Sequence, residues 1–214
     1  MLLPQTNALI LNMVEKHLIL GMLWLLFCVL HSLLASLGIK QWMRTRLGKS
    51  FKHYRLGYTL FAFVTLGIVI YYQIRLVSPF VFTPTVITQA AGIVIAVTGL
   101  MIMGICIKKY FMSLSGLKSL FQESPTNTLM IGGIHRFVRH PLYSGTFTFI
   151  WGLFLFYPVL SLLITNLIIT VYTLIGIELE EKKLEAEFGT DYKTYKQKVP
   201  KLFPALRYKS NSRF

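Results

Sequence analysis

The chain has 214 residues, of which 54% are hydrophobic and 14% are charged, and its formal net charge is +14. About 25% of the residues of a soluble domain are charged, so this composition excludes an ordinary water-soluble enzyme. The length allows one domain with a short tail. The positive charge is compatible with nucleic-acid binding, but basic and aromatic residues do not interleave as RNA binding would require, and we expect no nucleic-acid partner.

Five apolar runs follow one another along the chain. They cover His17–Ile39, Tyr54–Tyr72, Val86–Ile107, Leu142–Tyr157 and Val159–Ile177. A helix needs about 20 residues to cross the hydrocarbon core, which the first three runs reach. The last two are shorter, are compatible also with buried or re-entrant helices, and are separated only by Tyr157 and Pro158, as in a tight helical hairpin. We expect an all-α integral membrane protein in a lipid bilayer, with about five transmembrane helices and a cytosolic C-terminal helix.

The basic residues indicate how the helices are oriented. Most lie in the loop between the first two runs, in the loop between the third and fourth, and in the C-terminal tail. With five spans all three segments fall on one side of the membrane, and the other side keeps only Lys16 and Arg75. The positive-inside rule then predicts an external N-terminus and a cytosolic C-terminus, in what we expect to be the bacterial inner membrane.

The two cysteines carry no sign of a metal site. Cys28 and Cys106 each lie inside an apolar run, without a CxxC pattern or a neighbouring histidine. We therefore interpret them as structural thiols and expect neither a bound metal nor a disulfide.

A first polar cluster lies just before the fourth run, at Gly132–Gly145. Gly132 and Gly133 free the backbone to approach a ligand, and Pro141 suits the first turn of a helix. A helix N-terminus beside Arg139 and His140 can bind an anionic group. The alternative is that these basic side chains are ordinary anchors at the membrane surface.

A second polar cluster, Glu178–Gly189, follows the fifth run. Helical spacing places one carboxylate, Glu180 or Glu181, in an apolar stripe, and we expect Glu180 to hold a cationic group of a ligand. The alternative is a salt bridge from Glu180 to Arg136 or Arg139. Together with the basic turn, these acids could hold a zwitterion such as the amino-acid end of S-adenosylmethionine.

The two clusters match a known pair of motifs. Residues Arg139–Gly145 read RHPxYxG, and Glu180–Tyr195 read EExxLxxxFGxxYxxY and are followed by Val199 and Pro200. In this order, and separated by a two-helix hairpin, they resemble the membrane methyltransferase superfamily that includes isoprenylcysteine carboxyl methyltransferases and phospholipid N-methyltransferases. The resemblance covers about residues 125–204. It divides the single domain, 1–214, into an N-terminal three-helix part (1–124), a cofactor-binding core (125–204) and a basic tail (205–214).

The resemblance implies S-adenosylmethionine as the methyl donor and assigns its contacts. The residues that line its nucleoside end are Asn127, Thr128, Leu129, Met130 and His135. The turn that wraps it comprises His140, Pro141, Leu142 and Tyr143. The carboxylate that holds its amino group is Glu180, with Arg139 and Glu181 as second contacts.

The chain departs from the prenylcysteine enzymes at one position. Those enzymes carry an arginine one helical turn before the glutamate pair, where this chain has Gly176, which argues against a carboxylate acceptor. The segments His31–Ser36, Tyr54–Leu56 and Ile175–Glu181 are similar to the bacterial methanethiol S-methyltransferase branch. Membrane proteins grouped with nitrogen-oxide reduction share this likeness.

The sequence therefore predicts an S-adenosylmethionine-dependent methyltransferase acting on a small or lipophilic acceptor, with a thiol as one candidate. Candidate catalytic residues are Arg139, Tyr143 and His31, and the candidates for taking a proton are His31, His135 and Tyr143. The alternatives are an isoprenylcysteine-type carboxyl or phospholipid methyltransferase, and a non-catalytic membrane accessory protein, which could bind haem through His31. The acceptor, the pathway and the oligomeric state stay open.

Overall fold

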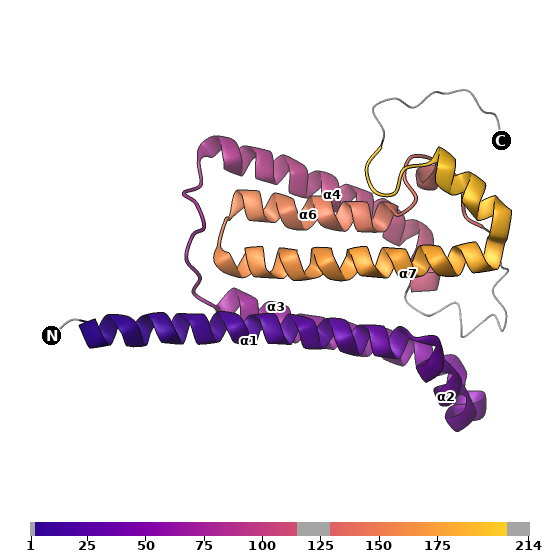
Figure 1. The fold of residues 1–214 in the computed structure, drawn as a ribbon, viewed down its shortest axis with the longest axis horizontal. Coiled ribbons are helices and arrows are strands. Elements are labelled where there is room, and N and C mark those ends of the chain that lie inside the picture. Colours follow the sequence, from indigo (N-terminus) through magenta and orange to yellow (C-terminus); the bar gives the residue numbers. More distant parts are fainter. Residues whose placement is uncertain (1–2, 115–128, 205–214) are drawn as a thin grey trace.

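The computed structural model describes residues 3–114 and 129–204, and this part of the chain contains helices and no β-strand (Figure 1). The α-helices are α1 (Leu3–Ala35), α2 (Leu37–Leu47), α3 (Tyr54–Arg75), α4 (Val86–Leu114), α6 (Pro141–Phe156) and α7 (Leu160–Lys198). Two short 3₁₀ helices are η1 (Gly48–His53) and η2 (Gly133–Arg136). The all-α architecture predicted from the sequence is confirmed.

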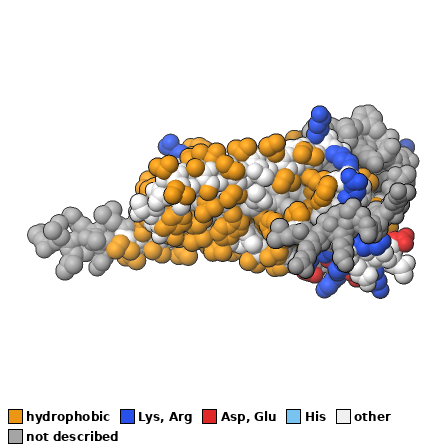
Figure 2. Space-filling view, turned by 90° about the horizontal axis from the view of Figure 1, so that it is seen from above, with side chains coloured by type: hydrophobic (Ala, Val, Ile, Leu, Met, Phe, Trp, Pro, Cys, Tyr) orange, Lys and Arg blue, Asp and Glu red, His pale blue; other side chains and the backbone are white. Residues whose placement is uncertain are grey.

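Among the described residues, four helical segments are long and apolar enough to cross a membrane, and α6 is a shorter fifth. The 16 residues of α6 reach about 24 Å, somewhat less than the hydrocarbon core. The predicted hairpin is present, since α6 ends at Phe156 and α7 begins at Leu160. Hydrophobic side chains cover the body of the molecule, and most of the visible Lys and Arg side chains lie at one end (Figure 2). The chain is an integral membrane protein.

Several helix boundaries differ from those of the predicted runs, and two of the differences have a clear local cause. The first run was expected to continue to Ile39, but α1 ends at Ala35 because the Ser36 hydroxyl caps a new helix by accepting a hydrogen bond from the Ile39 amide, at 3.4 Å. The fifth run was expected to end at Ile177, before a separate helix. Instead α7 continues through the Glu- and Lys-rich stretch, which favours helix, and the break comes only at Gly189, where a kink separates two helical segments.

Helices α4 and α6 form the closest antiparallel pair, because small residues allow their backbones to touch. A Cβ atom on Gly99 would lie 2.4 Å from the Phe149 amide nitrogen, and one on Gly152 would lie 2.4 Å from that of Ala96. Small residues at such positions are the usual basis of close helix packing in membranes, where the hydrophobic effect does not drive helices together. This contact fixes α6, and with it the turn that precedes α6.

Helices α1, α3 and α7 pack through both apolar and polar contacts. Leu20 and Trp24 of α1 and Val69 of α3 form a buried cluster against one face of α7. The Gln73 side-chain oxygen accepts hydrogen bonds from the Trp24 indole, at 3.3 Å, and from the Thr165 hydroxyl, at 3.0 Å. The N-terminal helices are therefore attached to the first turns of α7.

We predict that Gly99→Ala destabilises the protein by about 1–3 kcal/mol, because the added methyl group forces α4 away from α6. Gly104→Ala on the same helix is the control, since a Cβ there meets no described atom within 4 Å. It should be neutral or stabilising by up to about 1 kcal/mol. Unfolding in mixed detergent micelles measures both variants. Equal stability of the two would contradict the packing described above.

Candidate functional site

The turn before α6 is held by the chain segment that follows α7. Gly133, with a φ of 65°, starts η2, and Pro141 occupies the first turn of α6 as predicted. The backbone amides of Arg139 and His140 donate hydrogen bonds to the carbonyl oxygens of Pro200 and Lys201, at 2.9 and 3.1 Å. Two segments 61 residues apart thereby form one unit, which explains why the RHP and VP motifs occur together.

A bend in α7 brings its C-terminal segment back over this turn. Gly189 has a φ of 54°, a conformation that favours glycine, and the helix changes direction there (Figure 1). Beyond the bend, Tyr192, Tyr195 and Val199 form a buried cluster against Leu129 and other apolar side chains. The Tyr195 hydroxyl donates a hydrogen bond to the His135 carbonyl oxygen, at 2.7 Å. The tail motif is therefore a packing element that closes over the turn.

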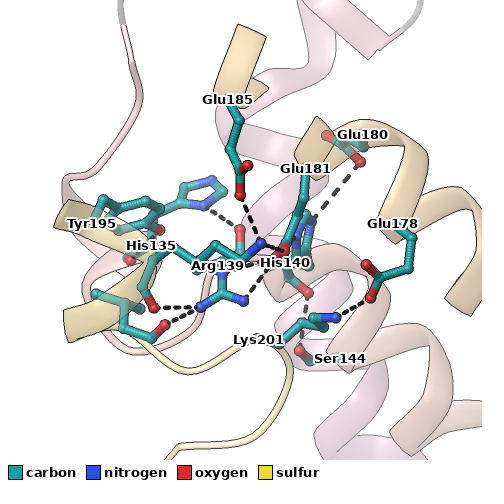
Figure 3. Close-up of polar contacts among 12 residues, drawn as sticks. His135, Arg139, His140, Ser144, Glu178, Glu180, Glu181, Glu185, Tyr195 and Lys201 are labelled. Carbon is teal, nitrogen blue, oxygen red and sulfur yellow. Dashed lines mark hydrogen bonds and ion pairs between the residues drawn. The ribbon is translucent and has the colours of Figure 1, made fainter. Parts of the chain in front are cut away.

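Glu181 is the centre of the polar contacts in this unit (Figure 3). Its side chain is 1% exposed, and its Oε1 atom accepts hydrogen bonds from Arg139 Nε at 2.9 Å and Nη2 at 2.8 Å. His140 Nε2 lies 3.1 Å from the same oxygen, and Lys196 Nζ lies 3.1 Å from Oε2. A buried carboxylate is tolerated only with such partners, so these three side chains are required for its burial.

Arg139 also stabilises the end of α7. Its Nη1 atom donates to the carbonyl oxygens of Lys196, at 2.8 Å, and Val199, at 2.5 Å, which a helix C-terminus otherwise leaves without partners. The Ser144 hydroxyl lies 2.9 Å from the His140 carbonyl oxygen and 2.5 Å from that of Leu202. The arginine of the RHP motif thus connects α6, α7 and the final segment.

Glu180 lies beside this network and remains accessible. Its side chain is 46% exposed, and its Oε2 atom is 3.9 Å from His140 Nδ1. The Tyr143 side chain lies within electrostatic range of the Glu180 carboxylate, and the His140 and Tyr143 rings stack with centroids 5.8 Å apart. Three side chains of the two sequence clusters, Glu180, His140 and Tyr143, therefore face one another.

The apolar stripe, which could contain Glu180 or Glu181, contains Glu181. Ile177 is fully buried, and the residue four positions later on the same helix face is Glu181. The alternative of a salt bridge from Glu180 to Arg136 or Arg139 is not seen among the described residues, where Arg139 pairs with Glu181.

The other predicted residues are placed as follows. Asn127 and Thr128 lie outside the described residues. Leu129 packs on the tyrosine cluster, Met130 is exposed, and Leu142 is half-buried in the first turn of α6. His31 lies in α1, where Tyr58 of α3 contacts it with its hydroxyl 2.9 Å from Nε2.

The His135 imidazole ring contacts the backbone of the turn before α6. Its Nδ1 atom lies 3.0 Å from the Arg139 carbonyl oxygen, to which it donates when Nδ1 carries the proton. Burial is the main cause that lowers the pKa of His135, and the hydrogen bond to Arg139 opposes it. The imidazole is therefore mainly neutral at pH 7.

Sequence reasoning missed two members of the site. Lys196, which pairs with Glu181 and with Glu185 at 2.7 Å, is one of many lysines in a basic tail, and no local pattern distinguishes it. The buried Tyr192 hydroxyl has no hydrogen-bond partner among the described residues. It was read as part of the tail motif, but no role was assigned to it. Within residues 3–114 and 129–204, no cluster of three or more His, Cys, Asp or Glu side chains is arranged to hold a metal ion.

Comparison with known proteins adds the following relatives. The family described as "NnrU protein" matches residues 17–206. Methanethiol S-methyltransferase 1 of Bradyrhizobium diazoefficiens is 29% identical over 208 residues, covering 90% of this chain and 68% of the relative. The methanethiol S-methyltransferase of Crocosphaera subtropica is 29% identical over 202 residues (86% and 73% covered), and that of Pseudomonas deceptionensis 28% over 195 (85% and 70%). No solved structure matches the chain significantly.

We predict that Arg139→Met destabilises the protein by about 3–5 kcal/mol, because it leaves the Glu181 carboxylate buried with fewer partners. Arg136→Met removes an exposed arginine of the same segment and should change stability by less than about 0.5 kcal/mol. Unfolding in mixed micelles again serves as the measurement. Replacing Glu181 by Met in the Arg139→Met background should recover part of the loss. The account fails if Arg139→Met is no more harmful than Arg136→Met.

Proposed function

The chain belongs to the NnrU protein family, and from this membership and the geometry of the site we propose that it is a membrane methyltransferase that transfers a methyl group from S-adenosylmethionine to a small thiol. The observation that carries the proposal is the difference in burial and contacts between two adjacent glutamates. Glu181 is buried and paired with Arg139, whereas Glu180 is accessible beside His140 and Tyr143. The second carboxylate is thus available to a ligand.

The residues present fit the donor. Its amino group requires an anionic partner, which Glu180 supplies, and its polar groups require donors and acceptors such as His140 and Tyr143. The buried, unpartnered hydroxyl of Tyr192 is a further group that a bound ligand would satisfy, because buried polar groups normally have a partner. We assign the donor-binding core to residues 125–204.

For methyl transfer, the protein mainly has to position the donor and the acceptor. The donor supplies a methyl group on a sulphonium sulphur, and a nucleophile displaces it in line, so the protein contributes mainly orientation and electrostatic stabilisation. A site made of a carboxylate, an imidazole and a phenol can provide both.

Two observations favour a thiol as the acceptor. The three relatives described above are named methanethiol S-methyltransferases, and they cover most of this chain. In addition, α7 has Gly176 one turn before Glu180, where a carboxylate acceptor would call for a basic residue.

We predict that Glu180→Gln weakens S-adenosylmethionine binding about 10- to 150-fold, because a charged hydrogen bond contributes about 1.5–3 kcal/mol. Glu187→Gln, an exposed acid on the same helix, is the matched control and should bind as the unchanged protein does. Calorimetry on purified protein in mild detergent measures both. Equal binding by the two variants would remove Glu180 from the site, and no binding by the unchanged protein would refute the proposed function.

The distribution of basic residues supports a cytosolic C-terminus and donor site, with the N-terminus outside. Single cysteines at Val77, which is 90% exposed between α3 and α4, and at Lys183 of α7 test this orientation. Both native cysteines are buried, so the background should be low. In intact bacterial cells a membrane-impermeant maleimide should label position 77 and spare position 183, and permeabilised cells should label both. Labelling of position 183 alone in intact cells would reverse the orientation.

A further inference from the structure

Polar side chains meet between α1, α3 and α7, inside segments that are otherwise apolar. We call His31 and Ser32 of α1, Tyr58 of α3 and Tyr172 of α7 the polar seam. The Tyr58 hydroxyl lies 2.9 Å from His31 Nε2, and the two rings are 5.3 Å apart. The Ser32 hydroxyl donates to the Tyr172 hydroxyl at 3.0 Å. Polar groups are costly in membrane helices and commonly mark a ligand path.

The polar seam continues to the proposed donor site through Tyr143. This side chain, in α6, lies within electrostatic range of Tyr58, Tyr172 and Glu180. A molecule bound between the seam and Tyr143 would therefore be next to the side chains that face the donor. The N-terminal helices and the C-terminal core contribute to one continuous polar region.

A glycine leaves space in this region. Tyr172, Gly176 and Glu180 are spaced by four residues and share one face of α7. A Cβ atom on Gly176 would meet no described atom within 4 Å. The open position lies between the seam tyrosine and the carboxylate that we assign to the donor, so that a group bound there would be next to both.

We infer that the polar seam is the acceptor site, that it binds a small thiol, and that His31 takes the thiol proton. This inference rests on the proposed function. Of the three candidate proton acceptors, His135 lies outside the seam, in the turn before α6, and Tyr143 lies beside the Glu180 carboxylate. His31 is half-buried in the seam itself, with Tyr58 beside it.

The reaction balances as follows. The S–H bond of the thiol breaks and its proton moves to the His31 imidazole, which leaves the thiolate as the nucleophile. The thiolate sulphur forms a bond to the methyl carbon of the donor while the bond from that carbon to the sulphonium sulphur breaks. The sulphonium sulphur keeps the electron pair and becomes a neutral thioether, and the imidazolium returns its proton to solvent.

Other titratable groups near His31 could also influence the pH dependence of the reaction. They are Tyr58 and the nearby Arg55 from α3, Tyr172 from α7, and Cys28 one turn earlier on α1. The phenols and the thiol are neutral near pH 7, so the pH range of the reaction should follow His31 and the thiol substrate.

The first test places a larger side chain at the open position, Gly176. Gly176→Leu should raise the KM for methanethiol at least tenfold, because its side chain occupies the space assigned to the acceptor. Its calorimetric Kd for S-adenosylmethionine and its unfolding midpoint should stay as in the unchanged protein. Gly104→Leu on α4, where a Cβ also meets no described atom, is the control for adding the same side chain. An unchanged KM in Gly176→Leu would overturn the assignment of the acceptor site.

The second test examines whether His31 accepts the proton of the thiol. His31→Gln should lower kcat near pH 7 about 100-fold, in the range of general-base catalysis, with donor binding unchanged. The loss should shrink as the pH rises toward the pKa of the thiol, since solution then supplies the thiolate. A kcat equal to that of the unchanged protein, or a loss that does not depend on pH, would overturn the role of His31.

These outcomes distinguish a failure of the seam assignment from a failure of the proposed function. If the unchanged protein binds S-adenosylmethionine and methylates methanethiol while Gly176→Leu and His31→Gln both behave like it, the seam assignment fails and the proposed function stands. If the unchanged protein binds no donor or methylates no thiol, the proposed function fails and the seam assignment fails with it.

Discussion

Burial of a single carboxylate, Glu181, determines how the C-terminal part of the chain is arranged. A charged group at 1% exposure requires polar or cationic partners, and Arg139, His140 and Lys196 converge on it from the turn before α6 and from the end of α7. Because Arg139 also binds the last carbonyl oxygens of α7, the same contact fixes the bend at Gly189. The shape of the proposed donor site therefore depends on an ion pair that need not touch the donor.

Many residues of the two motifs are thus explained by folding. Arg139 and Glu181 form the ion pair, Gly145 gives α6 its close approach to Met103 of α4, and Gly189 makes the bend. What remains for a ligand is the exposed edge of the same unit, at Glu180 and its neighbours. A conformation held by a buried network keeps such an edge in a defined geometry, which is what a reaction that depends on positioning requires.

The sequence allowed prediction of features set by local physics. Apolar length identified the helices, and Pro141 marked the start of α6. The sequence did not show which of the two adjacent glutamates is buried, because both fit the apolar stripe. The long-range ion pair with Arg139 determines that it is Glu181. The polar seam could not be predicted from the sequence, because His31 and Tyr172 come together only when α1 packs on α7. Asn127 stays a prediction.

The central claim is that neighbouring glutamates have different tasks, and two variants measured side by side test it most directly. For Glu180→Gln and Glu181→Gln, both the stability in mixed micelles and the calorimetric affinity for S-adenosylmethionine should be determined. We predict that Glu180→Gln keeps its stability and loses affinity, whereas Glu181→Gln loses stability first. If Glu180→Gln proves the less stable variant and binds the donor normally, the account is contradicted.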